Sequence, residues 1–257
     1  IPIGPHRRFD PLGDRWVLVS AGRTKRPWQG SKERRPTVDD RPRFDPDCYL
    51  CPGNTRVSGE QNPQYDSTFV FTNDFAALRP DAGDEVYSEG LLRAEAQAGT
   101  CRVICFSPRH DLTLTRMEPE GVREVIEMWA EQTIDLGRDW RWVQIFENRG
   151  AAMGASNPHP HGQIWSGAAL PDYAAREDAS QRRHHAGTRR RLLLDVVEQE
   201  HGGQRVVEEG DEWLALVPFW AVWPFETLLV PKRPAARIPD LDRGHRPDER
   251  SRARGAR

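Results

Sequence analysis

The chain has 257 residues, of which 37% are hydrophobic, and this is enough to bury one large core or two smaller ones. A formal net charge of −2 argues against a protein whose main task is to coat nucleic acid. No apolar run reaches the roughly 18 residues that a membrane span needs, and the N-terminal segment lacks the apolar stretch of a signal peptide. We therefore expect a cytoplasmic protein with no nucleic-acid partner and no membrane partner.

The first part of the chain predicts short strands around one long helix. Apolar residues at helical spacing from Val122 to Ile134, followed by Gly137, predict an amphipathic helix. Residues 79–98 lack a strand pattern, and we expect a loop there. Runs rich in β-branched and aromatic residues predict strands over residues 15–20, 67–78, 99–107 and 141–148.

The second part of the chain repeats some of this plan. Residues 159–166 are expected to be extended, and residues 173–200 to contain two helices. Residues 211–241 then follow the order aromatic strand, turn, apolar strand, proline and basic residue. The same order occurs when residues 67–80 are joined to residues 99–114, which indicates a faint internal repeat.

This pattern predicts an α+β fold. We expect one complete module over residues 1–200 and the beginning of a second, truncated copy over residues 201–241. Residues 242–257 are rich in arginine and lack apolar periodicity, so we expect a disordered tail there.

Two cysteines separated by two residues suggest a metal site. Cys48 and Cys51 have the gap that lets two thiolates in a turn bind one ion, although they could also be two buried thiols. Cys101 and Cys105 lie four residues apart on a predicted strand, a separation of roughly 13 Å, so we expect core residues. His110 follows a strand end and is a candidate third ligand, unless it only caps a turn.

The motif HPHGQ at residues 159–163 supplies the remaining candidates. In an extended segment, residues two apart point the same way, so His159, His161 and Gln163 are expected to share one face. One of the two histidines would complete a Cys2His2 set, which leaves no open position and indicates a structural role. The glycine-containing loop before the motif, with Gly154 and Ser156, could approach phosphate oxygens closely.

A histidine directed at phosphorus can act as a base or as a nucleophile, and Gln163 favours the nucleophile. An amide can donate hydrogen bonds to a phosphoryl oxygen but cannot supply a proton to a leaving group. A sugar 1-phosphate needs no such proton, because its second ionisation, with a pKa of about 6, leaves it largely anionic at neutral pH. We therefore predict that His161 forms a nucleotidyl-histidine that a second sugar phosphate can reverse.

At this point the sequence resembles the galactose-1-phosphate uridylyltransferase family, the transferase branch of the histidine-triad proteins. The most specific segment is FENRGAAMGASNPHPHGQIW at residues 146–165, and the likeness extends over DPDCYLC and RVICFSPRH to about Leu241. The resemblance implies an antiparallel sheet that forms a half barrel with helices outside. It also implies exchange of UMP between UDP-glucose and galactose 1-phosphate, and a homodimer.

The resemblance also implies roles for individual residues. His161 is the implied nucleophile and Gln163 the phosphoryl-binding amide. Glu177 matches the carboxylate of a second metal site, which holds iron in bacterial relatives. The implied zinc ligands are Cys48, Cys51, His110 and His159. The implied contacts to uridine and phosphates are Arg23, Arg26, Asn73, Asp74, Asn148, Gly154 and Ser156.

The sequence departs from the family pattern near its end. The other histidine ligands of the second metal site and the residues that reach a partner's active site are missing, and Pro234 stands where relatives often have histidine. We expect the zinc site and His161 to be assembled and the second site to be incomplete. The main hypothesis is an active uridylyltransferase. The alternatives are a noncatalytic zinc- and nucleotide-binding remnant, and a relative that acts on another nucleotide sugar or as a phosphorylase.

Overall fold

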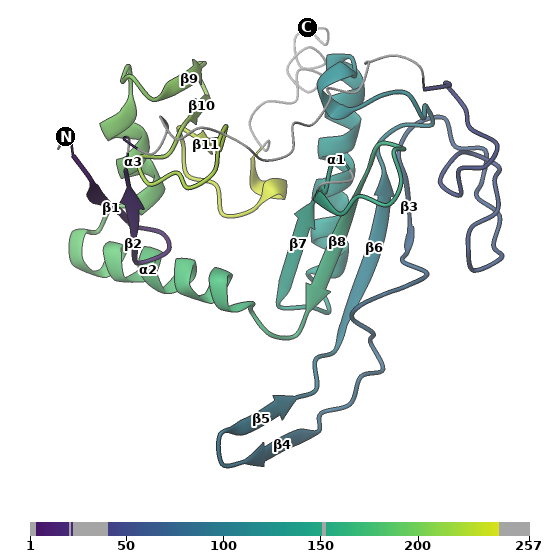
Figure 1. The fold of residues 1–257 in the computed structure, drawn as a ribbon, viewed down its shortest axis with the longest axis horizontal. Helices are drawn as coiled ribbons and strands as arrows, with labels where there is room; N and C mark the ends of the chain where they lie inside the picture. Colours follow the sequence, from purple (N-terminus) through teal and green to yellow (C-terminus); the bar gives the residue numbers. More distant parts are fainter. Residues whose placement is uncertain (1–3, 21, 23–40, 151–152, 242–257) are drawn as a thin grey trace, which may run out of the picture. The chain divides into compact units, whose positions relative to one another are not determined.

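Figure 1 shows the computed structural model of the chain, which describes residues 4–20, 22, 41–150 and 153–241. Two compact units are present. Among the described residues, the first unit combines residues 4–20 and 22 with residues 171–241, and the second unit combines residues 41–150 with residues 153–170. The buried hydrophobic clusters each lie within a single unit, so each unit has a core of its own.

A four-stranded antiparallel sheet forms the centre of the second unit (Figure 1). Its strands, in spatial order, are β3 (Phe69–Thr72), β6 (Gly99–Cys105), β8 (His161–Gly167) and β7 (Trp142–Phe146). Burial alternates along β8 between buried Gly162 and Ile164 and the more exposed His161, Gln163 and Trp165. The pleat therefore presents the histidine motif on one face of the sheet and apolar residues on the other.

Helix α1 (Pro119–Leu136) covers the apolar face of this sheet (Figure 1). Proline at the first helical position and Gly137 at the end bound the helix, as its sequence pattern predicts. A short 3-10 turn, Leu114–Arg116, precedes it. The helix and sheet share a buried cluster that consists of Ile104, Phe106, Val125, Met128, Leu136 and Ile164.

The expectation of a loop over residues 79–98 is wrong. This segment contains a β-hairpin, β4 (Val86–Glu89) and β5 (Leu92–Glu95), joined by a turn in which Gly90 has a φ of 58°. Every residue of both strands is exposed, so the segment carries no alternation of buried and exposed positions that would reveal it in the sequence.

The first unit joins segments that are far apart in the sequence. Its N-terminal part is an antiparallel pair, β1 (His6–Asp10) and β2 (Arg15–Val19), of which only β2 was expected. Polar residues dominate β1 and hide it from a pattern search. The remainder consists of helices α2 (Asp172–Thr188) and α3 (Leu192–Glu200), strands β9 (Val206–Glu209), β10 (Trp213–Leu216) and β11 (Leu228–Pro231), and the 3-10 turn Ile238–Asp240.

Strands β9, β10 and β11 form an antiparallel sheet with β10 in the middle. Helix α3 packs against it, and both elements contribute to one buried cluster. This cluster consists of Leu192, Val196, Val197, Leu214, Leu216, Trp220 and Val230. Strands β10 and β11 fall on the aromatic and apolar runs that the sequence marks between residues 211 and 241.

The fold class is α+β with antiparallel sheets, as expected. The sheet of the second unit is an open four-stranded sheet among the described residues, not a barrel. The boundary between the compact units lies near residue 170, whereas the sequence places a module boundary at residue 200. The truncated second copy therefore stays a prediction, and the arginine-rich tail lies outside the described residues. No described helix combines the length and apolarity needed to cross a membrane.

Candidate active site and metal centre

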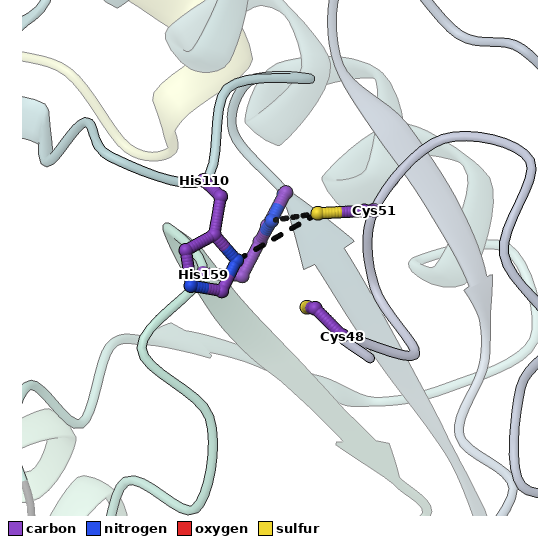
Figure 2. Close-up of side chains that lie close together, drawn as sticks. All are labelled: Cys48, Cys51, His110 and His159. Atoms are coloured by element: carbon purple, nitrogen blue, oxygen red, sulfur yellow. Dashed lines mark hydrogen bonds between the residues drawn. The ribbon is translucent and has the colours of Figure 1, made fainter. Parts of the chain in front are cut away.

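Four buried side chains from three segments meet in the second unit. Their ligand atoms all lie within 4.8 Å of one another, and the set is Cys48, Cys51, His110 and His159. Figure 2 shows both imidazole rings next to Cys51, whose Sγ lies 3.6 Å from Nδ1 of each ring. This cluster could hold one metal ion. It also settles the choice between the paired histidines, because the ring that joins the cysteines is that of His159.

Hydrogen bonds fix which nitrogen of His159 is free. Its Nε2 lies 2.9 Å from the Ser107 backbone carbonyl oxygen, which can only accept, so Nε2 carries the proton and donates. The lone pair is therefore on Nδ1, which faces Cys51. A hydrogen bond from the far nitrogen to a carbonyl oxygen is the usual support for a metal-binding imidazole.

Burial controls the charges of the cluster. It lowers the pKa of His159 to about 4 and also lowers the pKa of His110, so both rings are neutral at pH 7. Burial raises the pKa of the Cys51 thiol to about 11. Because metals bind the thiolate, a cation that enters this cluster has to displace the thiol proton.

Asn157 ties Cys48 to His159. Its Nδ2 lies 3.4 Å from Cys48 Sγ, and its Oδ1 accepts a 2.8 Å hydrogen bond from the His159 backbone N–H. The Leu50 N–H also points to Cys48 Sγ, at 3.4 Å. These N–H groups would stabilise a negatively charged sulfur. Cys101 and Cys105 are fully buried free cysteines on β6 outside this cluster, as expected for core residues.

A pocket of about 320 Å³ lies in the second unit beside the cluster. It is on the face of the sheet opposite α1, because its strand residues alternate with those that pack against the helix. Apolar side chains and polar side chains both line it. The lining residues are Tyr49, Leu50, Val57, Phe71, Asn73, Asp74, Phe75, Val103, Ser156, His161 and Gln163.

His161 is held with one ring nitrogen free. Its Nδ1 lies 2.7 Å from the backbone carbonyl oxygen of His159, which can only accept a hydrogen bond. Nδ1 therefore carries the proton, and Nε2 has the lone pair. His159 supplies this carbonyl, and its ring also belongs to the cysteine–histidine cluster. His159 therefore links the cluster directly to His161.

Gln163 follows His161 on the same face of β8 and also lines the pocket. Its Oε1 accepts a hydrogen bond from Trp165 Nε1 at 3.3 Å. Because the oxygen faces Trp165, the NH2 group remains as the donor that can bind an anion. The expected row of three side chains is thus a row of two in the pocket, since His159 turns away into the cluster.

The other predicted contacts divide into three groups. Asn73, Asp74 and Ser156 line the pocket. Asn148 and Gly154 are exposed in the second unit but are not among the lining residues, and Gly154 has a φ of 80°. Arg23 and Arg26 lie outside the described residues.

Glu177 lies on α2 in the first unit, next to Asp10 and Arg15. Burial and then the Asp10 carboxylate raise its pKa, while Arg15 opposes the shift. Among the described residues only one cluster has a metal-ligand set, and Glu177 is not part of it.

Sequence reasoning missed the apolar walls of the pocket. Leu50, Phe71 and Val103 line it, but each belongs to a run that reads as ordinary core. The available signal was the two-residue alternation along β3 and β6, which places Phe71 and Val103 on the same face as His161 once the strand register is known.

Comparisons with known proteins identify the family of the chain. Residues 2–171 match the family model "Galactose-1-phosphate uridyl transferase, N-terminal domain", and residues 177–251 match the corresponding C-terminal domain. The chain is 50% identical to galactose-1-phosphate uridylyltransferase of Haemophilus influenzae over 92% of its own length, and 51% identical to that of Rattus norvegicus over 95%. It spans 68% and 64% of these two relatives.

Solved structures show the same fold. A uridylyltransferase structure aligns over 91% of this chain and 70% of that chain, with a TM-score of 0.67 at 23% identity. An ADP-glucose phosphorylase of Arabidopsis thaliana, with bound ADP-glucose, aligns over 93% of this chain and 72% of that chain, with a TM-score of 0.69 at 23% identity. The matched domains define the class as nucleotidyl transferases. Within it, the chain belongs to the galactose-1-phosphate uridylyltransferase family.

Proposed function

We propose that this chain exchanges UMP between UDP-glucose and galactose 1-phosphate through a uridylyl-histidine intermediate. The observation that carries the proposal is the free Nε2 of His161 in a pocket with polar and apolar walls. The activity named for the curated relatives supports it. No observation on the described residues favours the noncatalytic alternative.

The chemistry consists of two displacements at one phosphorus. In the first, the lone pair of His161 Nε2 forms a P–N bond to the α-phosphorus of UDP-glucose, and the P–O bond to glucose 1-phosphate breaks. The departing phosphate takes the electron pair and needs no proton. In the second, a phosphate oxygen of galactose 1-phosphate attacks the same phosphorus and the P–N bond returns its electrons to the ring.

The other pocket residues bind and orient the nucleotide in this proposal. The Gln163 NH2 group donates to a phosphoryl oxygen, where charge increases during each displacement. The Ser156 hydroxyl is a second donor for a phosphate. Phe71 and Val103 form an apolar wall that suits the face of a base.

We assign the four-residue cluster to zinc. With Zn–S near 2.3 Å and Zn–N near 2.05 Å, a tetrahedral site has S···N edges of about 3.6 Å. The two measured distances from Cys51 Sγ to the histidine Nδ1 atoms are 3.6 Å, and the soft donor set suits zinc. Four protein ligands leave no open position, so the ion would cross-link the segments that carry His161 and the pocket. A second metal, iron, at Glu177 would need ligands that the described residues do not supply.

Covalent labelling tests the proposal. The zinc-loaded protein is incubated with UDP-glucose, and its intact mass is measured. We expect a gain of one UMP, which galactose 1-phosphate removes with release of UDP-galactose. His161→Ala should show no gain, and His201→Ala, an exposed histidine of the first unit, should behave as wild type.

A zinc-loaded wild type without an adduct contradicts the proposal. An adduct without release of UDP-galactose supports the noncatalytic remnant. An adduct that forms with ADP-glucose in preference to UDP-glucose supports a different nucleotide sugar. We also propose a cytoplasmic homodimer, as the family resemblance implies, and the native mass measures the subunit number.

A further inference from the structure

The nucleotide pocket is closed on one side by a loop that starts and ends at the cysteine turn. This loop, residues 54–62, has a neck formed by the bridge between Thr55 and Gln61 and by a 2.9 Å hydrogen bond from Asn62 N to Asn54 O. At its other end Val57 lines the pocket. The loop therefore runs between the Cys48–Cys51 turn and the pocket wall.

Two asparagine side chains fasten the neck to the cysteine turn. Asn62 Nδ2 donates to the backbone oxygens of Tyr49 at 2.9 Å and Cys51 at 3.0 Å, which uses both of its hydrogens. Asn54 Nδ2 donates to Cys48 O at 2.7 Å and also lies 2.9 Å from Asp45 O. The two side chains thus donate hydrogen bonds to carbonyl oxygens of the Cys48–Cys51 turn, which carries both thiols.

The orientation of the Asn62 amide is fixed by its surroundings. Its side chain is only 3% exposed, and its Oδ1 has no hydrogen-bond partner. If the amide were flipped, this oxygen would face the carbonyl oxygens of Tyr49 and Cys51, and like dipoles would repel. A buried acceptor without a partner is costly. The two hydrogen bonds that Asn62 Nδ2 donates to the oxygens of Tyr49 and Cys51 offset this cost.

The tip of the loop is fastened to the pocket wall at two points. The Ser58 N–H donates to Asp74 Oδ2 at 3.3 Å, and Asp74 lines the pocket. The Arg56 guanidinium carbon lies 4.2 Å from the centre of the Phe71 ring, which also lines the pocket. Arg56 is 8% exposed, so this cation–π contact is shielded from water.

We propose that Asn62 and Asn54 are positioning residues for nucleotide binding, because their hydrogen bonds hold the loop that closes the pocket against the cysteine turn. The proposal rests on the function proposed above for the pocket. When the donors of the neck are lost, the loop should loosen and Val57 and Ser58 should leave the pocket wall. The nucleotide should then bind more weakly although the zinc ligands and His161 are unchanged.

Asn62→Asp tests this with a change of almost no volume. The carboxylate has no hydrogens to donate and faces two carbonyl oxygens. Gln64→Glu is the matched control, since it makes the same chemical change two residues away on an exposed side chain outside the neck. Two measurements are made on zinc-loaded proteins of verified metal content: the dissociation constant of UMP, and the rate of trypsin cleavage after Arg56, identified by fragment mass.

For Asn62→Asp we expect UMP to bind about tenfold more weakly, which corresponds to one buried hydrogen bond. We expect cleavage after Arg56 to be at least about tenfold faster, because local opening exposes its side chain. Gln64→Glu should match wild type in both measurements. If Asn62→Asp does not fold, Asn54→Asp makes the same test at the less buried end of the neck.

The proposal is overturned if Asn62→Asp with bound zinc matches wild type in both measurements, or if Gln64→Glu is impaired equally. Faster cleavage with unchanged UMP affinity also overturns it, because the loop would then not contribute to binding. The two proposals fail in different ways. If wild type does not bind UMP at all, the proposed function fails, whereas wild-type binding that Asn62→Asp retains removes only the role of the loop.

Discussion

A single backbone carbonyl determines which ring nitrogen of His161 has the lone pair. The His159 carbonyl oxygen accepts the Nδ1 hydrogen, so the lone pair is on Nε2. The alternation of His159, His161 and Gln163 could be predicted from the sequence, and so could the shared face of the last two. The residues alone left open which of the two histidines joins the cysteines, and the family resemblance implied His159. The hydrogen bonds to Asn157 and Ser107 that turn His159 into the cluster could not be predicted, because they depend on the folded chain.

At the same scale, Gln163→Glu should slow uridylylation. The change replaces the amide donor with a carboxylate that repels the phosphates. We expect the rate of adduct formation to fall by about a hundredfold, as when one donor to a developing anion is lost. Thermal stability should be little changed. Gln144→Glu on β7 is the control, since this exposed amide does not line the pocket. Equal rates in wild type and Gln163→Glu would remove Gln163 from the mechanism.

Glu209 gives the first unit a defined acid sensitivity. Hydrogen bonds from Lys232 and then from His201 lower the pKa of its carboxyl from 4.5 to about 2. A carboxyl with a lowered pKa in the folded state stabilises that state fully above its unfolded pKa. The contribution is lost as the pH falls from about 4.5 to about 2.

Glu209→Gln should therefore lower the melting temperature at pH 6, and the difference from wild type should shrink as the pH approaches 2. Thermal unfolding at a series of pH values measures this. Added salt should reduce the difference at pH 6, because both side chains of the Lys232–Glu209 pair are partly accessible to solvent and its ions. A difference that stays constant from pH 6 to pH 2 would contradict the electrostatic explanation.

Close packing between neighbouring strands constrains the central sheet. A Cβ added to Gly162 on β8 would lie 2.8 Å from the Phe106 ring and 2.8 Å from the Phe146 backbone oxygen. The second contact is with the neighbouring strand β7, whose backbone cannot move without disturbing its pairing to β8. Gly162 thus permits the strand spacing that places His161 and Gln163 on the pocket face.

Gly162→Ala should destabilise the second unit by about 1–3 kcal/mol, the usual cost of overpacking. Gly187→Ala provides the contrast, because its Cβ would meet no atom within 4 Å on helix α2. There we expect a gain of about 0.5–1 kcal/mol, since alanine favours a helix over glycine. Denaturant unfolding of both variants measures the two free energies. A neutral Gly162→Ala would mean that β7 shifts at little cost.

The elements differ in how well the sequence predicts them. Helix α1 could be predicted because its apolar residues recur at helical spacing. Strands β3, β6 and β7 could be predicted because they lie in runs of β-branched and aromatic residues, and β8 because its segment reads as extended. Strand β1 and the β4–β5 hairpin could not, because they have polar or wholly exposed side chains. What pairs β4 with β5 is the turn at Gly90, and a single glycine also occurs in ordinary loops.

At the scale of the whole molecule, the division into two units is a property of the cores. The cluster with Leu214 lies entirely in the first unit, whereas the clusters with Ile104 and Cys48 lie entirely in the second. The sequence could not reveal this division, because residues 4–20 join residues 171–241 across an intervening unit. Separate cores make separate unfolding transitions the expected behaviour.

Removal of the metal should therefore affect one transition only. We expect calorimetry of the zinc-loaded chain to show two transitions, and a chelator to lower the second unit's transition because only that unit contains the cysteine–histidine cluster. Leu214→Ala, which removes a fully buried side chain, should lower the other transition by an amount that corresponds to about 2–5 kcal/mol.

Two cysteine variants separate loss of the metal from loss of a buried thiol. Cys48→Ser removes a ligand and should reproduce the effect of the chelator, after which the chelator has no further effect. Cys101→Ser removes a buried thiol that is not in the cluster. In this variant the unfolding transition of the second unit should still respond to the chelator in full. A single transition that moves as a whole with chelator and with Leu214→Ala alike would show that the two cores unfold cooperatively. In that case the metal would stabilise the entire chain, because loss of the cluster would unfold the first unit together with the second.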